Sequence, residues 1–238
     1  MDKISVIIVS YNAEKDLQAC LDSIQAQTYS PIELVVVDGA SQDGTIDILK
    51  NNPGVVTKWI SEKDTGIYDA MNKGLKLITG DWVYFLGADD RLLPDFSEMI
   101  KVLKDKRTIY YGSVLAKGTK YLGYLNPYQQ AKTGICHQAM IYPKYVFEKY
   151  SFDTRYRISA DHHLNMKCWA DPEINIHFAD YIIAWFNHTG ISSMEEDKLF
   201  KQQKSTLILK YFGVVLWLRF LFRELKWKLF QRKQERSL

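Results

Sequence analysis

Residues Ile60–Asp90 read ISEKDTGIYDAMNKGLKLITGDWVYFLGADD and contain the signals that decide the fold. The helical pattern DAMNKGLKLI lies between two short apolar segments, and this alternation is typical of a βαβ unit. The second apolar segment, DWVYFL, is soon followed by two adjacent carboxylates, Asp89 and Asp90. Parallel α/β sheets bind ligands at the carboxyl ends of their strands. The stretch therefore predicts both a parallel sheet and the edge at which its site lies.

The same alternation continues on both sides of this stretch. Upstream, we predict strands at Lys3–Ser10, Pro31–Asp38 and Val55–Ser61, and helices at Glu14–Gln27 and Asp43–Lys50. Downstream, we predict helices at Pro94–Lys106 and Ser159–Ala170, and strands at Thr108–Leu115 and Lys120–Leu125. Strands that alternate with helices indicate an α/β fold in which a central, mostly parallel sheet lies between helical layers.

Composition and charge are those of one main domain with a distinct C-terminal tail. The chain has 238 residues, of which 47% are hydrophobic, and a net charge of +3. The last twenty residues carry seven basic and two acidic side chains, a net charge of +5, so the remainder carries −2. Three widely spaced cysteines, Cys20, Cys136 and Cys168, show no metal-ligand or redox spacing, which favours a reduced, cytoplasmic compartment.

Polar side chains follow the first two predicted strands. Ser10, Tyr11 and Asn12 end the first strand, where an aromatic ring can stack on a base and polar groups can bind it. Asp38 and Ser41 follow the second strand, beside glycines that let the backbone approach a ligand. The alternative for both sets is structural, because the same residue types cap helices and turns.

Asp69, Asn72 and Lys73 lie at the start of the helix that follows Gly66. A helix N-terminus favours anions, so Lys73 could meet a phosphate there. The alternative is an ion pair between Asp69 and Lys73, which are four residues apart on a solvated helix face.

Asp89 and Asp90 would repel each other unless a cation neutralises them. Mg²⁺ or Mn²⁺ binds carboxylate and phosphate oxygens together, and would stabilise negative charge on a leaving diphosphate. The alternative is a surface turn in which Asp90 caps the helix that begins near Pro94.

The tail carries an apolar segment, Tyr211–Phe222, that Arg219 interrupts. A membrane span needs about 20 apolar residues, so we do not expect this segment to cross a bilayer. Several apolar residues share one helical face beside basic ones, which predicts an amphipathic helix on an anionic membrane surface: Leu218, Leu221, Phe222, Leu225 and Leu229 beside Arg219, Arg223 and Lys226. The alternative is packing against the main domain or against a second copy in a homodimer. Because the net positive charge is confined to this aromatic-rich tail, we expect no nucleic-acid partner.

Six motifs together resemble the family 2 glycosyltransferases: SVIIVSYN, VVVDGASQDGT, SEKDTGIYDAMNKG, TGDWVYFLGADD, ICHQAMIYPK and ISADHHLNMK. The resemblance spans Ile4 to Asn187 and is closest to members that build bacterial surface polysaccharides. It implies a GT-A fold, which is a Rossmann-like three-layer αβα architecture, and an inverting glycosyltransferase of the hexosyltransferase type.

The resemblance also implies roles for individual residues. Ser10, Tyr11, Asp38 and Asn72 would surround the base and ribose; Asp89 and Asp90 would hold the ribose, metal and diphosphate; Asp161 would be the catalytic base; His137 and Gln138 would line the sugar or acceptor site; and His188 would point at the metal or diphosphate. Inversion needs one base, which deprotonates the acceptor hydroxyl as it attacks the anomeric carbon.

Two departures from the family pattern stand out. Gly87 and Ala160 replace acidic residues that the family often has at these positions. The Gln-x-x-Arg-Trp motif of processive members does not occur in the sequence, which favours the transfer of a single sugar.

We therefore expect a catalytic domain at residues 1–200 and a helical, membrane-interface tail at 201–238. The nucleotide-binding half would cover about 1–92 and the acceptor half about 93–200. The predicted function is Mn²⁺- or Mg²⁺-dependent transfer of a sugar from a nucleotide-sugar donor, most simply a UDP-sugar, to a lipid-linked saccharide at the cytoplasmic face of the cell membrane.

Two other functions are weighed against this one. The first is a non-catalytic nucleotide- or glycan-binding subunit of a membrane assembly complex. The second is a nucleotidyltransferase, which ranks last because the chain has no Gly-rich basic loop near its N-terminus.

Overall fold

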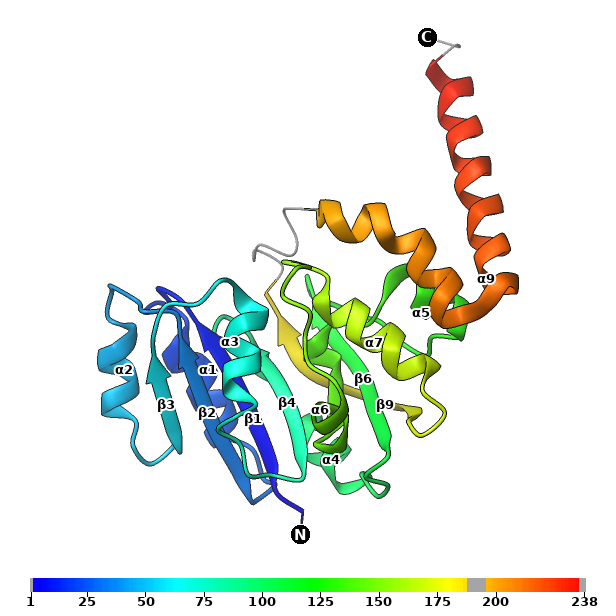
Figure 1. Ribbon diagram of the computed structural model, residues 1–238. Coiled ribbons are helices and arrows are strands. Elements are labelled where there is room, and N and C mark those ends of the chain that lie inside the picture. Colours follow the sequence, from blue (N-terminus) through cyan, green and yellow to red (C-terminus); the bar gives the residue numbers. More distant parts are fainter. Residues whose placement is uncertain (1, 188–195, 236–238) are drawn as a thin grey trace.

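A sheet of nine strands forms the centre of the computed structural model, which describes residues 2–187 and 196–235 (Figure 1). The strands are β1 (Ile4–Ser10), β2 (Ile32–Asp38), β3 (Lys58–Ser61), β4 (Trp82–Gly87), β5 (Arg91–Leu92), β6 (Thr108–Ala116), β7 (Thr119–Tyr121), β8 (Met140–Pro143) and β9 (Asn175–Phe186). The helices are α1 (Leu17–Gln25), α2 (Thr45–Asn51), α3 (Ile67–Gly74), α4 (Asp95–Lys101), α5 (Pro127–Thr133), the 3-10 helix η1 (His137–Ala139), α6 (Tyr145–Lys149), α7 (Ala160–Ala170) and α9 (Lys198–Glu235).

The sheet is largely parallel, as predicted. Its order is β3-β2-β1-β4-β8-β6-β9-β5, with β7 paired to β6. The strands β3, β2, β1 and β4 run parallel, whereas β8 is antiparallel to both of its neighbours, β4 and β6. The central strands are apolar on both faces because both faces are covered. Ile7 and Val35 face one core, and Val6 and Val36 face the other.

Helices cover the two faces of the sheet and form separate cores with it (Figure 1). Buried residues of α1 and α4 pack with one face, whereas buried residues of α3, α5, α6 and α7 pack with the other. The predicted three-layer αβα architecture is confirmed.

Two predicted strands are shorter in the structure because the backbone follows other geometry at their ends. The strand expected at Val55–Ser61 begins only at Lys58, since the Val55 and Val56 amides donate to the Asn52 carbonyl in a turn. The strand expected at Lys120–Leu125 ends at Tyr121 as part of β7, and Leu122 has a φ of 69°, which breaks an extended strand.

Several elements between Asn126 and Phe186 escaped the sequence prediction. The start of α5 carries a capping box between Asn126 and Gln129, with Pro127 as its first residue. These residues are a recognisable helix start that could have been used. The strands β8 and β9 gave weaker signals: β8 has four residues, and β9 is only partly buried along its length.

The C-terminal helix α9 consists of two arms that meet at Gly213, where φ is 77° and ψ is 174°. The first arm packs on the main domain, with Phe200, Leu207 and Ile208 buried in its core. Beyond Gly213 the second arm projects away from the domain (Figure 1). The first arm of the tail therefore belongs to the main domain, whereas the predicted amphipathic face from Leu218 to Leu229 lies on the second arm.

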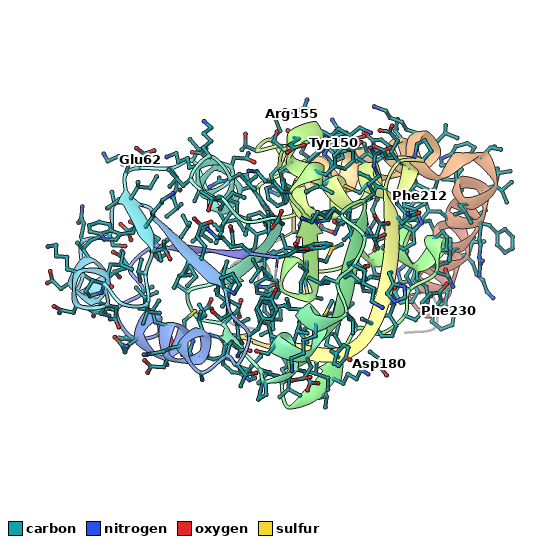
Figure 2. All side chains as sticks on the ribbon, turned by 90° about the horizontal axis from the view of Figure 1, so that it is seen from below. Glu62, Tyr150, Arg155, Asp180, Phe212 and Phe230 are labelled. Atoms are coloured by element: carbon teal, nitrogen blue, oxygen red, sulfur yellow. The ribbon has the colours of Figure 1, made fainter. Side chains whose placement is uncertain are left out.

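The base of the second arm is held by three contacts. The Trp217 indole N–H donates to Ser205 Oγ of the first arm at 3.0 Å. The Arg219 guanidinium lies 4.1 Å from the ring centre of Tyr128 in α5. Phe220 is buried in the core. Side chains farther along the arm are exposed, and Figure 2 shows Phe230 at the opposite side of the molecule from Glu62.

The apolar part of the tail extends beyond the segment Tyr211–Phe222 that was considered for a membrane span. Between Lys198 and Trp227, α9 is long and apolar enough to cross a membrane by length and composition alone. However, the bend at Gly213 falls inside the apolar segment Tyr211–Phe222 and divides it between the two arms. A straight crossing takes about 20 apolar residues in one helix. The apolar residues of either arm do not reach that length by themselves.

We expect Gly74→Ala to destabilise the fold. A Cβ at Gly74 would lie 2.6 Å from Ile7 Cγ2, a branched core atom of β1. Overpacking of this kind costs about 1 to 3 kcal/mol, against a gain of up to about 1 kcal/mol in helix propensity. Denaturant unfolding should show a net loss of stability. Gly54→Ala, whose Cβ meets nothing within 4 Å, is the matched control, and equal stability of the two variants would contradict the packing argument.

Candidate functional site

The carboxyl ends of β1, β2 and β4 meet at one edge of the sheet. Ser10 at the end of β1 is paired in register with Asp38 at the end of β2, and Val9 is paired with Gly87 at the end of β4. Because the three strands are parallel, the loops that follow them converge there. The residues predicted for a nucleotide and a metal are thus brought to one edge.

The side chain of Asp38 holds these loops together. Its side chain is fully buried and accepts hydrogen bonds from Ser10 Oγ at 3.1 Å, the Ser41 amide at 2.9 Å and Ser61 Oγ at 2.7 Å. The Asp38 carboxylate therefore joins the ends of β1, β2 and β3. This is the structural alternative considered for Asp38, and direct contact of Ser10, Asp38 and Ser41 with a nucleotide stays a prediction.

Asn12 holds the loop after β1 to the loop after β2. The backbone amide of Asn12 donates to Ser41 Oγ at 2.8 Å, and the side-chain oxygen Asn12 Oδ1 accepts from the backbone amide of Gln42 at 2.9 Å. Asn12 and Ala40 have positive φ angles of 49° and 63°. Backbone in this region persists only where its surroundings enforce it, and it is common beside ligand sites.

An open hollow of about 500 Å³ lies beside the loops that Asp38 and Asn12 hold together. It is lined by Tyr11, Gly39, Ala40, Gln42, Lys63, Asp64, Thr65, Gly66 and Arg157. Tyr11 is 66% exposed, so its ring is available to stack on a planar ligand. Lys63 and Arg157 add positive charge, and Asp64 adds a hydrogen-bond acceptor. This combination suits a nucleotide base with an attached phosphate.

The three predicted residues of α3 are not among the residues that line this hollow, and two of them, Asp69 and Lys73, support its wall. Asp69 accepts from the Thr65 amide at 3.0 Å. Lys73 Nζ donates to the Lys63 carbonyl at 2.7 Å, pairs with Glu62 at 3.0 Å and lies 3.8 Å from Asp69. The structure thus contains the Asp69–Lys73 pair that was considered as the structural alternative. Both residues fix the 62–66 loop.

Asn72 faces another segment. Its side chain donates to the Phe152 carbonyl at 2.9 Å and accepts from the Phe152 amide at 3.1 Å. Both ends of the Asn72 amide therefore hold the chain that leads to α7, and its predicted contact with the base or ribose would require these bonds to break.

Asp89 and Asp90 occupy different environments, although they are adjacent. Asp90 is 1% exposed. It accepts hydrogen bonds from the Gln138 side chain at 2.9 Å, the Asn187 backbone amide at 2.8 Å and the Gly87 backbone amide at 3.2 Å. Burial raises the pKa of Asp90, and these hydrogen bonds partly oppose the rise. Asp89 is half-buried, and its bond from Asn187 Nδ2 is longer, at 3.2 Å. Burial and the neighbouring Asp90 charge raise the pKa of Asp89.

These environments fit a divalent cation at Asp89. A cation beside Asp89 would relieve the repulsion between the two carboxylates. Gln138 Oε1 is buried and has no hydrogen-bond partner among residues 2–187 and 196–235, so it can accept from a sugar hydroxyl or a metal-bound water. The same residues contain no group of three His, Cys, Asp or Glu side chains that could hold a metal ion. We expect Asp89 to hold the metal and Asp90 to fix the loop around it.

Gly87 is needed for this arrangement. A Cβ at Gly87 would lie 2.7 Å from Asp90 Oδ2 and 2.9 Å from Asp89 Oδ1. Both contacts are closer than real Cβ atoms make. Gly87, where the family often has an acidic residue, therefore leaves the space that the two carboxylates occupy.

Asp161 lies near the start of α7, where its side chain contacts His137 of η1. Asp161 Oδ2 is 3.3 Å from His137 Nδ1, and Oδ1 accepts from the His162 amide at 2.7 Å. Burial raises the pKa of Asp161, but the hydrogen bond and charge of His137 outweigh it and hold the pKa below its usual range. An ionised carboxylate of this kind can accept a proton from a substrate hydroxyl.

His137 and Gln138 connect the two groups of carboxylates. His137 contacts Asp161, and the next residue, Gln138, donates to Asp90. The prediction for His188 falls outside the described residues.

Sequence reasoning missed several residues of the site. Lys63, Asp64 and Thr65 lie inside the motif SEKDTGIYDAMNKG, where the glycine of a turn was a usable signal. Arg157 lies 93 residues after Asp64, with which it lines the hollow, and Asn187 lies 97 residues after Asp90, to which its backbone amide donates. Their positions had no local signal, because only the tertiary structure brings them to this edge.

Comparison with known proteins identifies the class of this site. A model described as glycosyl transferase family 2 matches residues 5–167. A PGL/p-HBAD biosynthesis glycosyltransferase of Mycobacterium tuberculosis is 35% identical over 209 residues, which cover 82% of this chain and 81% of the relative.

Solved structures share the fold at low identity. TarS 1-349 of S. aureus has a TM-score of 0.69 and 19% identity over 88% of this chain, and the same fragment has been solved with UDP-GlcNAc. PcManGT, a mannosyltransferase from Pyrobaculum calidifontis solved with GDP-Man and Mn²⁺, has a TM-score of 0.63 and 19% identity. The chain spans 66% of TarS 1-349 and 63% of PcManGT.

The different environments of Asp89 and Asp90 lead to opposite expectations for their amide variants. Asp89→Asn should keep its folding stability and lose Mn²⁺-dependent nucleotide binding, because the charged ligand is gone. Asp90→Asn should be less stable by about 1 to 3 kcal/mol, since its amide group would face buried N–H donors. Denaturant unfolding and calorimetric titration of UDP with Mn²⁺ measure the two effects. The reverse pattern would assign the metal to Asp90.

Proposed function

The chain is a glycosyltransferase of family 2, and we propose that it transfers one sugar from a UDP-sugar to a lipid-linked saccharide, with inversion at the anomeric carbon. Its three-layer structure is the GT-A fold expected from the sequence. The observation that carries the proposal is the order of groups along the site. The base hollow, Asp89 and Asp161 supply a donor pocket, a metal ligand and a base.

The donor is assigned from the hollow at Tyr11. A stacking ring, two cations and a carboxylate suit a nucleoside diphosphate, and the carboxylate Asp89 lies at the end of the adjacent β4 loop. TarS has been solved with UDP-GlcNAc and PcManGT with GDP-Man, which supports a nucleotide-sugar as donor. We choose UDP first because the TarS fragment has the higher structural similarity of the two.

The proposed reaction is a direct displacement. Asp161 accepts the proton of the acceptor hydroxyl, the hydroxyl oxygen forms a bond to the anomeric carbon, and the bond to the nucleotide diphosphate breaks on the opposite face. A bound Mn²⁺ or Mg²⁺ at Asp89 would offset negative charge on the departing diphosphate. Gln138 and the Asn187 amide keep Asp90 fixed beneath that group.

We expect Asp161→Asn to lose transfer while it retains the donor. An amide cannot accept the hydroxyl proton, and the loss of a general base lowers kcat by about 10² to 10⁴ fold. Radiolabelled UDP-sugar transfer to a lipid-linked acceptor measures the rate, and calorimetry with UDP measures donor affinity. Asp153→Asn, a carboxylate paired with Arg155 before α7, is the matched control. Unchanged transfer by Asp161→Asn would place the base elsewhere.

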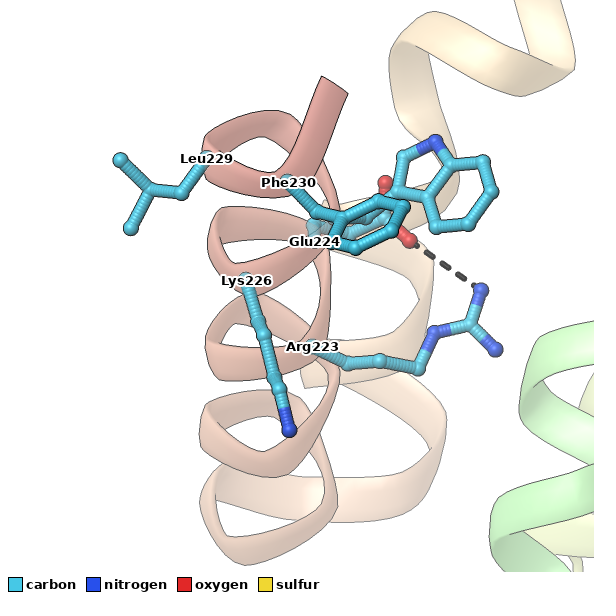
Figure 3. Close-up of a pocket in the computed structure, with 6 residues that line it drawn as sticks. Arg223, Glu224, Lys226, Leu229 and Phe230 are labelled. Carbon is cyan, nitrogen blue, oxygen red and sulfur yellow. Dashed lines mark hydrogen bonds and ion pairs between the residues drawn. The ribbon is translucent and has the colours of Figure 1, made fainter. Parts of the chain in front are cut away.

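The second arm of α9 is suited to an anionic membrane surface, where a lipid-linked acceptor would be found. Several apolar side chains of this arm are more than half exposed: Val214, Val215, Leu218, Phe222, Leu225, Trp227, Leu229 and Phe230. Arg223 and Lys226 lie among them, and Figure 3 shows Leu229 projecting from the helix on the side opposite the Arg223–Glu224 pair. Apolar burial with basic side chains at headgroup depth is how interfacial helices bind anionic bilayers.

We expect this arm to bind the full-length protein to vesicles that contain anionic lipid, less so at high salt. Phe222→Asp with Leu229→Asp should abolish co-sedimentation, because two charges would enter the apolar layer. Leu209→Asp, at an exposed leucine of the first arm, is the control. Binding that survives the double substitution would exclude the arm as the membrane contact, and concentration-dependent dimerisation lost in the same variant would favour a second copy of the chain as its partner.

A further inference from the structure

His137 has a position that a residue lining a sugar pocket would not need. Its Nδ1 lies 3.3 Å from Asp161 Oδ2, and both side chains are largely buried, at 12% and 14% exposure. The contact joins η1 to the start of α7, which are 24 residues apart along the chain. The imidazole therefore faces the side chain that the proposed reaction uses as a base.

The backbone that carries His137 is firmly held. The Ala139 amide donates to the Cys136 carbonyl at 3.0 Å across the turn. The Tyr84 hydroxyl donates to the Gln138 carbonyl at 2.7 Å, and the Gln138 side chain donates to Asp90. Three bonds on adjacent residues leave the turn little freedom, so the position of the imidazole is set by the sheet beneath it.

The other groups around Asp161 are neutral. Tyr68 of α3, Tyr142 of β8 and the neighbouring Cys136 all face Asp161, and burial raises the pKa of each above its usual range. Burial lowers the pKa of His162 on α7 itself to about 4, so this imidazole is uncharged at neutral pH. His137 differs from these described neighbours because its imidazole contacts the Asp161 carboxylate and is able to carry a positive charge.

We propose that His137 is a positioning residue whose Nδ1–H holds the Asp161 carboxylate in the orientation and charge state that proton abstraction requires. The inference rests on the proposed function, because it assigns Asp161 as the base. The proton of the acceptor hydroxyl goes to Asp161, the hydroxyl electron pair forms the new glycosidic bond, and the imidazole keeps its own proton. Orientation of a base by a second side chain is a general device in catalysis.

Two substitutions separate the contributions of His137. His137→Phe keeps the ring but removes the donor and the charge. His137→Asn keeps an N–H group near the position of Nδ1 without the ability to ionise. His177→Phe is the matched control, since His177 lies exposed on β9 and packs against Tyr110 outside the site.

We expect His137→Phe to lower kcat at least tenfold and leave the KM for the UDP-sugar unchanged. Activity requires ionised Asp161 and so rises with pH through its pKa. Loss of an opposite charge at this distance raises a carboxyl pKa by about 1 to 3 units, which would move the acidic limb of the pH–kcat profile to higher pH by that amount. His137→Asn should recover part of kcat while its acidic limb stays displaced. His177→Phe should match the wild type in both.

Three outcomes would overturn the inference. A folded His137→Phe protein with wild-type kcat and pH profile would show that the contact has no role. A change confined to the acceptor KM would make His137 an acceptor contact. A larger loss of kcat in His137→Phe than in Asp161→Asn would make His137 the base and Asp161 its support.

A measurement that does not need turnover separates this inference from the proposed function. The ¹³C carboxyl resonance of Asp161, identified by its absence in Asp161→Asn, reports the pKa of this group directly. A higher pKa in His137→Phe than in the wild type supports the pair, and an equal pKa contradicts it. If the wild-type protein transfers no sugar to any acceptor, the proposed function fails while this titration still decides the role of His137.

Discussion

The buried carboxylate of Asp90 joins the parts of the chain that form the site. It accepts hydrogen bonds from Gly87 at the end of β4, from Gln138 in η1 and from Asn187 just after β9. A buried carboxylate is costly unless its oxygens are satisfied, so these donors are required for the loop to fold as it does. Because Gln138 and Asn187 come from distant segments, satisfying one charge aligns Asp89, the metal ligand that we propose, with the turn that carries His137. The rest of the site depends on that alignment.

The nucleotide side of the site is organised in two levels. Asp38, Asn12 and Ser41 lie below and bind one another and the backbone. Tyr11 and the 63–66 loop lie above and line the hollow. The Asp38 carboxylate of this network is fully buried, and buried polar groups whose hydrogen bonds are satisfied make a structure rigid. The lower level therefore fixes the shape of the hollow that we propose as the pocket for the base of the donor.

The C-terminal helix also has a buried part and an exposed part. Its first arm completes the core above α5 and α7, whereas its second arm leaves the domain at Gly213 with its apolar side chains exposed. Arg219 on Tyr128 and Trp217 on Ser205 hold the base of that arm, so its direction is set relative to α5. The same α5 leads into Cys136 and η1. A membrane contact on the second arm would thus have a defined orientation relative to η1, which carries His137 and Gln138.

The sequence by itself determined the alternation of strands and helices, the edge at which the site lies and the residue types present there. Those features follow from local periodicity and from the polar residues that end apolar strands, which are both properties of neighbouring residues. The sequence could not determine which of these polar residues form hydrogen bonds within the fold and which stay accessible to a ligand. Asp89 and Asp90 are adjacent and chemically identical, yet the distant Gln138 side chain and Asn187 backbone amide bind Asp90 within the fold, whereas Asp89 is only half-buried and receives a single longer bond from the Asn187 side chain. The tertiary structure also decided the bend at Gly213 and the pairing of His137 with Asp161, because each depends on contacts between segments far apart in the chain.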